Sequence, residues 1–302
     1  MEKLEALKKT AENAGCLVLK DEPMSRHTTF QIGGPADLYI AVKDIIALKD
    51  IVRMAASLNV PLLTLGNGSN VVVSDEGIRG AVLSLTGDFR RITLSDPTTI
   101  CCGSGATLAA LCKFAQRNSL SGAEFAWGIP GSVGGAAFMN AGAYEGQFSD
   151  ILVSTTHVTT TGRTDSLLGP EMEMDYRKSA YLKNNCIITS IVVRLEPGNK
   201  EQISMQMDDY FSRRKEKQPL EQPSAGSIFK RPDGAYAGAL IEEAGLKGEK
   251  VGGAMVSEKH AGFIVNNGGA TCSDVKALIE KIQETVLKKS GVSLECEVRF
   301  IS

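Results

Sequence analysis

Apolar residues recur at helical spacing in several segments of the chain. In residues 44–59 the apolar positions fall three or four residues apart and Pro61 follows, which predicts an amphipathic helix. Thr107 has a side chain suited to cap a helix, and the pattern after it predicts a second helix to about Asn118. The first 25 residues predict a helix followed by an extended segment.

Short apolar runs between these helices predict strands. They occupy residues 61–65, 71–73, 81–85, 90–102, 151–160 and 186–195. The strand–helix–strand order near the start is typical of an α/β domain. The turn cluster Pro197-Gly198-Asn199 then predicts a domain boundary.

The residues after this boundary predict a separate, smaller α+β unit. Helices are expected at 200–217, at 237–244 with Gly245 as the stop, and from a cap at Ser273 to a stop at Gly291. Short strands are expected at Ile228-Phe229 and at residues 263–265.

Residues 292–301 alternate between apolar and polar side chains, which predicts one continuous strand. Its apolar face would carry Val292, Leu294, Cys296, Val298 and Phe300, and its polar face Ser293, Glu295, Glu297 and Arg299. Glu297 would therefore point away from the buried side of this strand.

Composition and charge narrow the function class. The 33 basic and 35 acidic residues give a net charge of −2, which argues against a broad nucleic-acid-binding surface. The hydrophobic fraction of 43% and charged fraction of 23% exclude bulk disorder. No apolar run reaches the roughly 18 residues of a membrane span, and the charged first five residues lack the apolar core of a signal peptide.

Seven cysteines are spread along the chain without a C-x-x-C pair, so no metal site is expected. They are Cys16, Cys101, Cys102, Cys112, Cys186, Cys272 and Cys296. Most lie in apolar runs, where a reduced cysteine behaves as a small hydrophobe. We therefore expect free structural thiols in a reducing cytoplasm.

Glycine is enriched, at 31 of 302 residues or about 10%, compared with roughly 7% in average proteins. One cluster is Leu65-Gly66-Asn67-Gly68-Ser69-Asn70, between two predicted strands. Its glycines allow successive backbone N–H groups to converge on an anion, with Ser69 and Asn70 as further donors. A plain hairpin or crossover turn is the alternative.

A second glycine cluster is Ile129-Pro130-Gly131-Ser132-Val133-Gly134-Gly135-Ala136. It is similar to a phosphate loop that enters a helix, although it matches neither G-x-G-x-x-G nor a Walker A motif. The glycines would let an anion approach a helix N-terminus without obstruction, and tight helix packing is the alternative. Two such loops in one domain favour a pyrophosphate ligand.

Six segments together resemble the UDP-N-acetylenolpyruvoylglucosamine reductases (the MurB family), within the vanillyl-alcohol-oxidase-like (PCMH-type) flavoproteins. The segments are 27–37, 65–70, 128–144, 176–179, 223–230 and 294–301, in family order over nearly the whole chain. The first three are typical of the flavin superfamily and the last three of the reductase.

This resemblance implies an α+β fold with two domains. Residues 1–197 would form a two-part PCMH-type FAD-binding domain, with subdomains at roughly 1–80 and 81–197. Residues 198–302 would form the smaller C-terminal α+β substrate-binding domain.

The resemblance also implies a reaction. The enolpyruvyl ether of UDP-N-acetylglucosamine would be reduced to the lactyl ether, giving UDP-N-acetylmuramate for peptidoglycan. NADPH would reduce the FAD, NADP+ would leave, and the UDP-sugar would then accept a hydride from flavin N5 at C3. The implied partners are the UDP-sugar and NADPH, with no nucleic acid and no membrane, in the cytoplasm.

Three catalytic roles follow from the same resemblance. Ser227 would protonate C2, and Arg177 and Glu297 would flank the substrate carboxylate or the forming enol. A glutamate that faces an enolate is useful only if it is protonated or acts through water. Without the resemblance, Ser227 would be a turn residue, Arg177 an exposed ion-pair residue and Glu297 a solvated strand position.

The implied binding residues fall into two groups. The FAD set is Gly66, Asn67, Gly68, Ser69, Asn70, Gly131, Ser132, Gly134 and Gly135, and the substrate set is Tyr144, Arg213, Lys217, Arg231 and His260. Arg213 and Lys217 lie one turn apart on a predicted helix and would share a face. A solvated charge run and a structural histidine are the alternatives for the substrate set.

The chain departs from the family pattern in details. Asn67 stands where the family often has a third glycine, and asparagine tolerates a left-handed backbone. The short link from Lys217 to Ser227 is similar to the type II enzymes, which lack a tyrosine-bearing loop over the substrate. No histidine lies in residues 65–70 to bind FAD covalently, so non-covalent FAD is expected.

Two other functions remain open at this point. One is a related flavin oxidase that uses O2 on an alcohol or lactone, and the other is a non-catalytic module that binds nucleotide sugars. The presence of Ser227, Arg177 and Glu297 argues against both.

Overall fold

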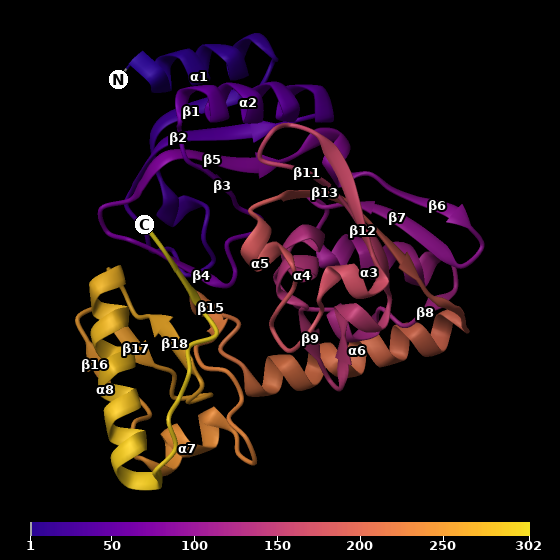
Figure 1. The fold of residues 1–302 in the computed structure, drawn as a ribbon. Coiled ribbons are helices and arrows are strands. Elements are labelled where there is room, and N and C mark those ends of the chain that lie inside the picture. The colour runs from indigo at the N-terminus through magenta and orange to yellow at the C-terminus, as the bar shows by residue number, and fades with distance from the viewer. Residues whose placement is uncertain (1) are drawn as a thin grey trace. The chain divides into compact units, whose positions relative to one another are not determined.

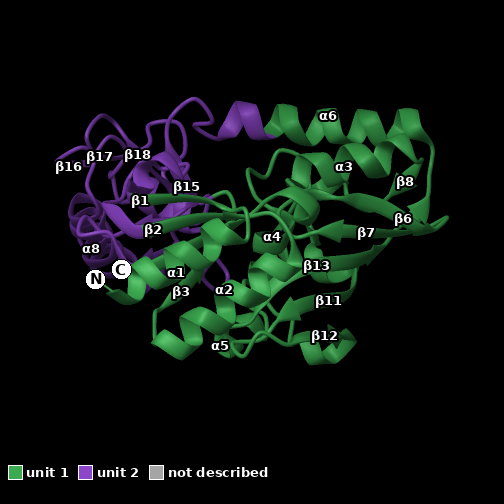
Figure 2. Cartoon of the chain, turned by 90° about the horizontal axis from the view of Figure 1, so that it is seen from above, with its two compact units in different colours: residues 1–20, 38–67, 80–213 green, residues 21–37, 68–79, 214–302 purple. Residues whose placement is uncertain are grey.

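The structure is a computed structural model that describes residues 2–302. The chain forms two compact units, each built from segments far apart in sequence (Figure 2). Unit 1 contains residues 2–20, 38–67 and 80–213, and unit 2 contains residues 21–37, 68–79 and 214–302. The boundary predicted at residues 197/198 stays a prediction.

Most of unit 1 consists of two sheets and the helices packed on them (Figure 1). One sheet has the order β1 (Leu17–Pro23), β2 (Pro35–Val42), β5 (Ile78–Leu85), β3 (Leu62–Thr64), with α1 (Glu2–Asn13) and α2 (Ile45–Leu58) contributing to its core. The other has the order β12 (Thr164–Leu168), β11 (Leu152–Val158), β13 (Ile187–Arg194), β7 (Thr99–Gly103), β6 (Ile92–Asp96).

A second core forms where helices pack against the five-stranded sheet. It includes residues of α3 (Leu108–Arg117) and α4 (Val133–Met139), together with the buried side chains Ile100, Ile191 and Val193 of β7 and β13. Two small strand pairs, β8 (Leu120–Ser121) with β14 (Glu196–Pro197) and β9 (Gly142–Ala143) with β10 (Gly146–Gln147), lie in the same unit. The short helix α5 (Tyr181–Asn184) and most of α6 (Lys200–Lys217) complete it.

Unit 2 is built on an antiparallel sheet with the order β15 (Ser224–Ser227), β18 (Phe263–Asn266), β17 (Ala254–Val256), β16 (Lys250–Val251). Its core joins this sheet to α7 (Ala237–Glu243) and α8 (Cys272–Ser290), as Figure 1 shows. A separate parallel pair joins β19 (Arg299–Ile301) to β4 (Val71–Val73). The whole chain is therefore a mixed α+β fold, as the sequence predicts.

Several predicted helix ends are confirmed. Asp44 accepts hydrogen bonds from the N–H groups of Ile46 and Ala47, both at 2.9 Å, and so caps α2. Thr107 caps α3 through the N–H of Ala110 at 3.1 Å. Such caps satisfy N–H groups that have no partner inside the helix.

The predicted cap at Ser273 is wrong. Thr271 caps α8 by accepting the N–H of Asp274 at 3.0 Å, and Asp274 in turn accepts the N–H of Thr271. This reciprocal capping box satisfies two unpaired donors at once, which a cap at Ser273 would not do. Gly291 ends the helix at φ +73°, as predicted.

The continuous strand predicted at 292–301 is also wrong. Only Arg299–Ile301 forms a strand, and Phe300, expected on the buried face, is 38% exposed. The strand expected at Ile228-Phe229 is displaced to Ser224–Ser227, and Phe229 makes only an isolated bridge to Cys296.

All seven cysteines are free thiols, as expected from their apolar surroundings. Burial raises the pKa of Cys102 and of Cys112 to about 12, so both stay protonated and unreactive. Within residues 2–302, no helix combines the length and apolarity needed to cross a membrane.

Candidate active site and cofactor loops

The loop from Gly66 to Asn70 connects β3 and β4 and offers unpaired donors. Within residues 2–302, no acceptor pairs with the five consecutive backbone N–H groups from Gly66 to Asn70. The left-handed residue is Gly68, at φ +62°, and a Cβ there would overlap the backbone of His27. Consecutive unpaired N–H groups in a glycine turn are suited to bind an anion.

The start of α4 differs from the anion site that its sequence suggests. Ser132 accepts the N–H of Gly135 at 3.1 Å, while the N–H groups of Val133 and Gly134 donate to Ala106 and Ser104, both at 2.8 Å. These helix N–H groups are therefore already used by the protein. A ligand near this segment would therefore be bound through close contact with its backbone and not through the N–H groups of Val133, Gly134 and Gly135.

Glycine gives this segment its close packing. A Cβ on Gly134 would lie 2.7 Å from the Cβ of Ser104, and a Cβ on Gly66 would overlap Oγ of Ser132. The close approach of Gly66 to Ser132 places the first glycine cluster beside the second within unit 1. The Ser104 hydroxyl is buried without a hydrogen-bond partner among the described residues, so it is available to a ligand placed there.

These features fit the diphosphate of a dinucleotide cofactor such as FAD. Gly66 and Asn67 supply unpaired N–H groups, Gly66 and Gly134 let their segments pack closely on Ser132 and Ser104, and Ser104 holds an unused hydroxyl. The sequence alone does not point to Ser104, because a single serine in a turn carries no signal until its burial is known.

Arg177 lies in unit 1 on a tight turn. Asp175 and Lys178 close this turn with two backbone hydrogen bonds of 3.1 and 3.0 Å, which leaves Tyr176 and Arg177 at its tip. Arg177 has a left-handed backbone at φ +54°, and its guanidinium donates to the carbonyls of Asn140 at 3.5 Å and Gly142 at 3.3 Å.

Tyr144 lies on the segment that follows Gly142 and is directed onto α6. Its ring stacks on Tyr210 with centroids 4.4 Å apart, and its hydroxyl donates to the Tyr210 carbonyl at 2.9 Å. Its backbone is left-handed at φ +51°. The aromatic ring predicted to contact substrate is therefore packed on α6 in this conformation.

Ser227 and Glu297 belong to unit 2, and the backbone brings their segments side by side. The N–H of Glu297 donates to the Ile228 carbonyl at 2.8 Å, and the N–H of Lys230 donates to the Glu295 carbonyl at 2.8 Å. Both Ser227 and Glu297 are half-buried. The side-chain amide of Asn70 donates to the Glu297 carbonyl at 3.4 Å, so part of the glycine loop also meets this pair.

The hydroxyl of Ser227 is only weakly engaged. It donates to the Phe229 carbonyl at 3.3 Å, beyond the 2.5–3.0 Å typical of an O–H···O bond. A left-handed Gly226, at φ +76°, precedes it at an irregular point of β15. The bulge directs the chain away from the regular ladder just before the predicted acid.

The predicted cationic substrate residues differ in their partners. Arg213 forms an ion pair with Asp209 one turn earlier on α6, at 2.7 Å. Arg231 lies over the ring of Tyr236, 4.1 Å from its centroid. Lys217 is exposed and has no such partner within the described part of the chain.

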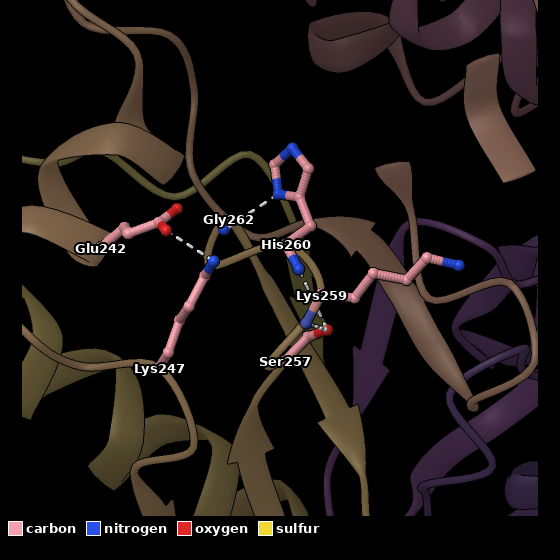
Figure 3. Close-up of polar contacts among 6 residues, drawn as sticks. All are labelled: Glu242, Lys247, Ser257, Lys259, His260 and Gly262. Carbon is pink, nitrogen blue, oxygen red and sulfur yellow. Dashed lines mark hydrogen bonds and ion pairs between the residues drawn. The ribbon is translucent and has the colours of Figure 1, made fainter. Parts of the chain in front are cut away.

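His260 is held in one orientation in unit 2. Figure 3 shows its Nδ1 accepting the N–H of Gly262, at 3.1 Å, and the Ser257 hydroxyl accepting the N–H groups of Lys259 and His260. Burial lowers the pKa of His260, and the positive charges of Lys247 and Lys217 lower it further. A neutral His260 with Nδ1 as acceptor carries its proton on Nε2.

The close-packed glycine segments of unit 1 and the unpaired N–H groups between Gly66 and Asn70 fit the class of dinucleotide-binding proteins. In agreement, the FAD binding domain family matches residues 36–167, and the family of the UDP-N-acetylenolpyruvoylglucosamine reductase C-terminal domain matches residues 218–301.

Curated relatives and a solved structure extend this similarity over the chain. A UDP-N-acetylenolpyruvoylglucosamine reductase of Agathobacter rectalis is 47% identical over 295 residues, covering 94% of each protein. Another, from Geobacillus thermodenitrificans, is 45% identical, covering 94% of this chain and 93% of the relative. The crystal structure of the reductase (MurB) from Thermus caldophilus matches with a TM-score of 0.82 at 36% identity, over 95% of this chain and 99% of that one.

The chain belongs to the UDP-N-acetylenolpyruvoylglucosamine reductase family, and it is an FAD-containing oxidoreductase. The roles given to individual residues by resemblance stay predictions.

Proposed function

We propose that the protein uses NADPH and FAD to reduce UDP-N-acetylenolpyruvoylglucosamine to UDP-N-acetylmuramate, a precursor of peptidoglycan. Relatives of this name match 94% of the chain, which supports the reaction. The observation that carries the residue assignment is the pairing of the Ser227 and Glu297 segments through Ile228. Their segments lie far apart in sequence and are brought side by side only in the fold.

The residues of unit 1 described above would hold the FAD. Gly66 and Asn67 would donate N–H groups to its diphosphate, and Ser104 would add its hydroxyl. When bound, the flavin supplies the hydride for substrate C3 through N5. The protein must then bind the sugar, stabilise the negative charge that develops on its carboxylate, and deliver a proton to C2.

Ser227 is proposed to deliver that proton. Its long bond to the Phe229 carbonyl is easily exchanged for a bond to substrate. An isolated serine hydroxyl is a poor acid, but an enolate is a strong enough base to take its proton. Glu297, held beside it by backbone hydrogen bonds, would contribute in its protonated form or through a water molecule.

Arg177 is proposed to stabilise the enolate. A guanidinium spreads positive charge over a planar group and meets a carboxylate with two donors. Its present bonds, at 3.5 and 3.3 Å to backbone carbonyls, are long enough to be exchanged for stronger bonds to a carboxylate. Lys217 is the better candidate for the substrate diphosphate, since Arg213 is paired with Asp209.

We place this reaction in the cytoplasm. Seven free thiols, four of them in buried positions, fit a reducing compartment.

The test is the dependence of NADPH oxidation on substrate. Purified protein should be yellow and release its flavin on denaturation, and NADPH oxidation should require UDP-N-acetylenolpyruvoylglucosamine. The product, identified by mass, should gain two hydrogens. Equal NADPH oxidation with O2 alone would instead identify a flavin oxidase, and absence of flavin a binding module.

A further inference from the structure

Asn140 is a buried polar residue that the proposed mechanism does not use. It ends α4 with a left-handed backbone, at φ +44°, and only 1% of it is exposed. A left-handed C-cap is ordinary for asparagine or glycine. A buried amide, however, must find partners for both its donors and its acceptor.

The amide of Asn140 finds those partners on both sides. Its Oδ1 accepts the N–H of Ser149 at 2.9 Å. Its Nδ2 donates to the Asp175 carbonyl at 3.0 Å and to Oε1 of Gln147 at 3.3 Å. The Asp175 bond connects the end of α4 to the turn that carries Arg177.

Asn140 touches that turn a second time. Its own carbonyl accepts Nη1 of Arg177 at 3.5 Å. The Asp175 carbonyl accepts the N–H of Lys178 at 3.0 Å as well as Nδ2 of Asn140, so both of its lone pairs are used. Asn140 thus bonds the 175–178 turn at its base, through the Asp175 carbonyl, and also accepts a hydrogen bond from the Arg177 side chain at its tip.

The turn needs such support because it is strained. Arg177 adopts a left-handed backbone, which costs a non-glycine residue about 1–2 kcal/mol. Strained residues persist where the surrounding structure holds them, and such positions cluster at functional sites. The bond from Asn140 supplies this restraint from a separate helix.

We propose that Asn140 is a positioning residue for Arg177: its side-chain amide holds the 175–178 turn so that the Arg177 guanidinium meets the substrate carboxylate. This inference rests on the proposed function, in which Arg177 acts only after the flavin has been reduced. Asn140 would therefore affect one half-reaction and leave the other unchanged.

Two variants remove the contact in different ways. Asn140→Gly keeps the left-handed helix end and the backbone carbonyl but deletes the amide, and Asn140→Asp keeps the size but places a carboxylate against the Asp175 carbonyl. Gln147→Ala is the matched control, because it removes the other partner of the same Nδ2 and leaves the Asp175 bond.

Stopped-flow absorbance of the flavin separates the half-reactions. Reduction by NADPH should stay within about twofold of wild type in all variants, whereas reoxidation by the UDP-sugar should slow by about ten- to a hundredfold in the two Asn140 variants alone, a loss expected for misplacement of a reacting group by about 1 Å. In an Arg177→Ala background, Asn140→Gly should cause no further loss. Equal loss in both half-reactions, or a full additional loss without Arg177, would overturn the proposal.

Amide hydrogen exchange measures how firmly the 175–178 turn is held, independently of the reaction. Peptides covering residues 173–180 should exchange faster in Asn140→Gly than in wild type or Gln147→Ala. Unchanged exchange overturns the proposal. If wild-type enzyme is not reoxidised by the UDP-sugar, the proposed function fails, while the exchange result still decides whether Asn140 holds the turn.

Discussion

Gly66 packs so closely on Ser132 that any side-chain carbon at position 66 would overlap the serine hydroxyl. The same hydroxyl caps α4 through the N–H of Gly135. One contact thus connects the loop with unpaired N–H groups to the start of the helix that ends at Asn140. The enrichment in glycine seen in the sequence has a specific steric purpose at this contact.

Gly66→Ala should weaken FAD binding. The new methyl group must displace either the loop or the Ser132 side chain, and loss of the cap alone costs about 1 kcal/mol. The measure is the ratio of flavin to protein absorbance after gel filtration. Adding Ser132→Ala should recover part of the bound flavin by removing the overlapping hydroxyl. If Gly66→Ala alone keeps its full flavin content, the contact between Gly66 and Ser132 is not needed for FAD binding.

Ser227→Ala should separate the two half-reactions. Reduction of the flavin by NADPH should proceed at the wild-type rate, because the serine is proposed to act on the sugar substrate alone. Formation of UDP-N-acetylmuramate should fall by about a hundredfold or more, the usual contribution of a positioned proton donor. Ser224→Ala, on the same strand, is the control and should retain activity. Product formation at the original rate in Ser227→Ala would exclude its role as the acid.

Asp75 should stabilise unit 2 in a pH-dependent manner. Its carboxylate accepts the N–H groups of Cys272 and Ser273, at 2.7 and 3.0 Å, and the Ser273 hydroxyl at 2.7 Å. Partial burial opposes its ionisation, but these hydrogen bonds outweigh burial and lower its pKa. Since the folded pKa is below that of the unfolded chain, the stabilisation is present above the unfolded value and is lost as the pH falls through the folded value.

Asp75→Ala should therefore reduce the free energy of unfolding by about 1 kcal/mol at pH 7, as for loss of a helix cap. Urea denaturation at pH 7 and at pH 3 measures this free energy. The difference in unfolding free energy between Asp75→Ala and wild type should be smaller at pH 3 than at pH 7. Glu76→Ala is the control, because its exposed side chain makes no such contact with α8 among the described residues. A difference in unfolding free energy that becomes larger at pH 3 would contradict the predicted loss of the Asp75 stabilisation in acid.

His157 should make the protein less stable below neutral pH. It is 4% exposed, and its Nδ1 lies 2.9 Å from the hydroxyl of Tyr181, which also meets Thr155 at 2.6 Å. Burial lowers the pKa of His157 from its ordinary value of 6.5. As the pH falls below 6.5, the unfolded chain binds a proton that the folded chain does not, so stability is lost by at most about 1.4 kcal/mol per pH unit.

His157→Gln should flatten this pH dependence between pH 7 and pH 5 in urea titrations. Thr155→Val breaks the same hydrogen-bonded group without removing the titrating side chain, so it should lower stability equally at both pH values. An unchanged slope in His157→Gln would assign the acid sensitivity to other groups.

Local patterns along the sequence predict much of the fold. The helix at Ile45–Leu58 follows from its apolar spacing, with Asp44 before it and Pro61 after it, because helix spacing and caps depend on neighbouring residues. The true start of α8 was also present in the sequence, since Thr271 and Asp274 have the spacing of a capping box. Ser273 lacks such a reciprocal partner, because Lys276 stands three residues after it.

Pairing between distant segments is what the sequence does not reveal. Residues 292–301 alternate well, yet only Arg299–Ile301 finds a partner strand, in Val71–Val73. The left-handed backbone of Arg177 and the burial of Asn140 likewise depend on contacts made by the finished fold. Resemblance to the family therefore names candidate site residues, whereas the backbone conformation and burial of their neighbours are seen only in the fold.

The parallel pairing of β19 with β4 also constrains the order in which the protein can fold on the ribosome. The strand Val71–Val73 directly follows the glycine loop, but its partner Arg299–Ile301 is synthesised only after every residue of unit 1 has been made. During translation, the edge of Val71–Val73 that pairs with Arg299–Ile301 has no partner strand until the last residues of the chain emerge. Completion of unit 2, including the strand pair that directly follows the glycine loop, is thus a late event in biosynthesis.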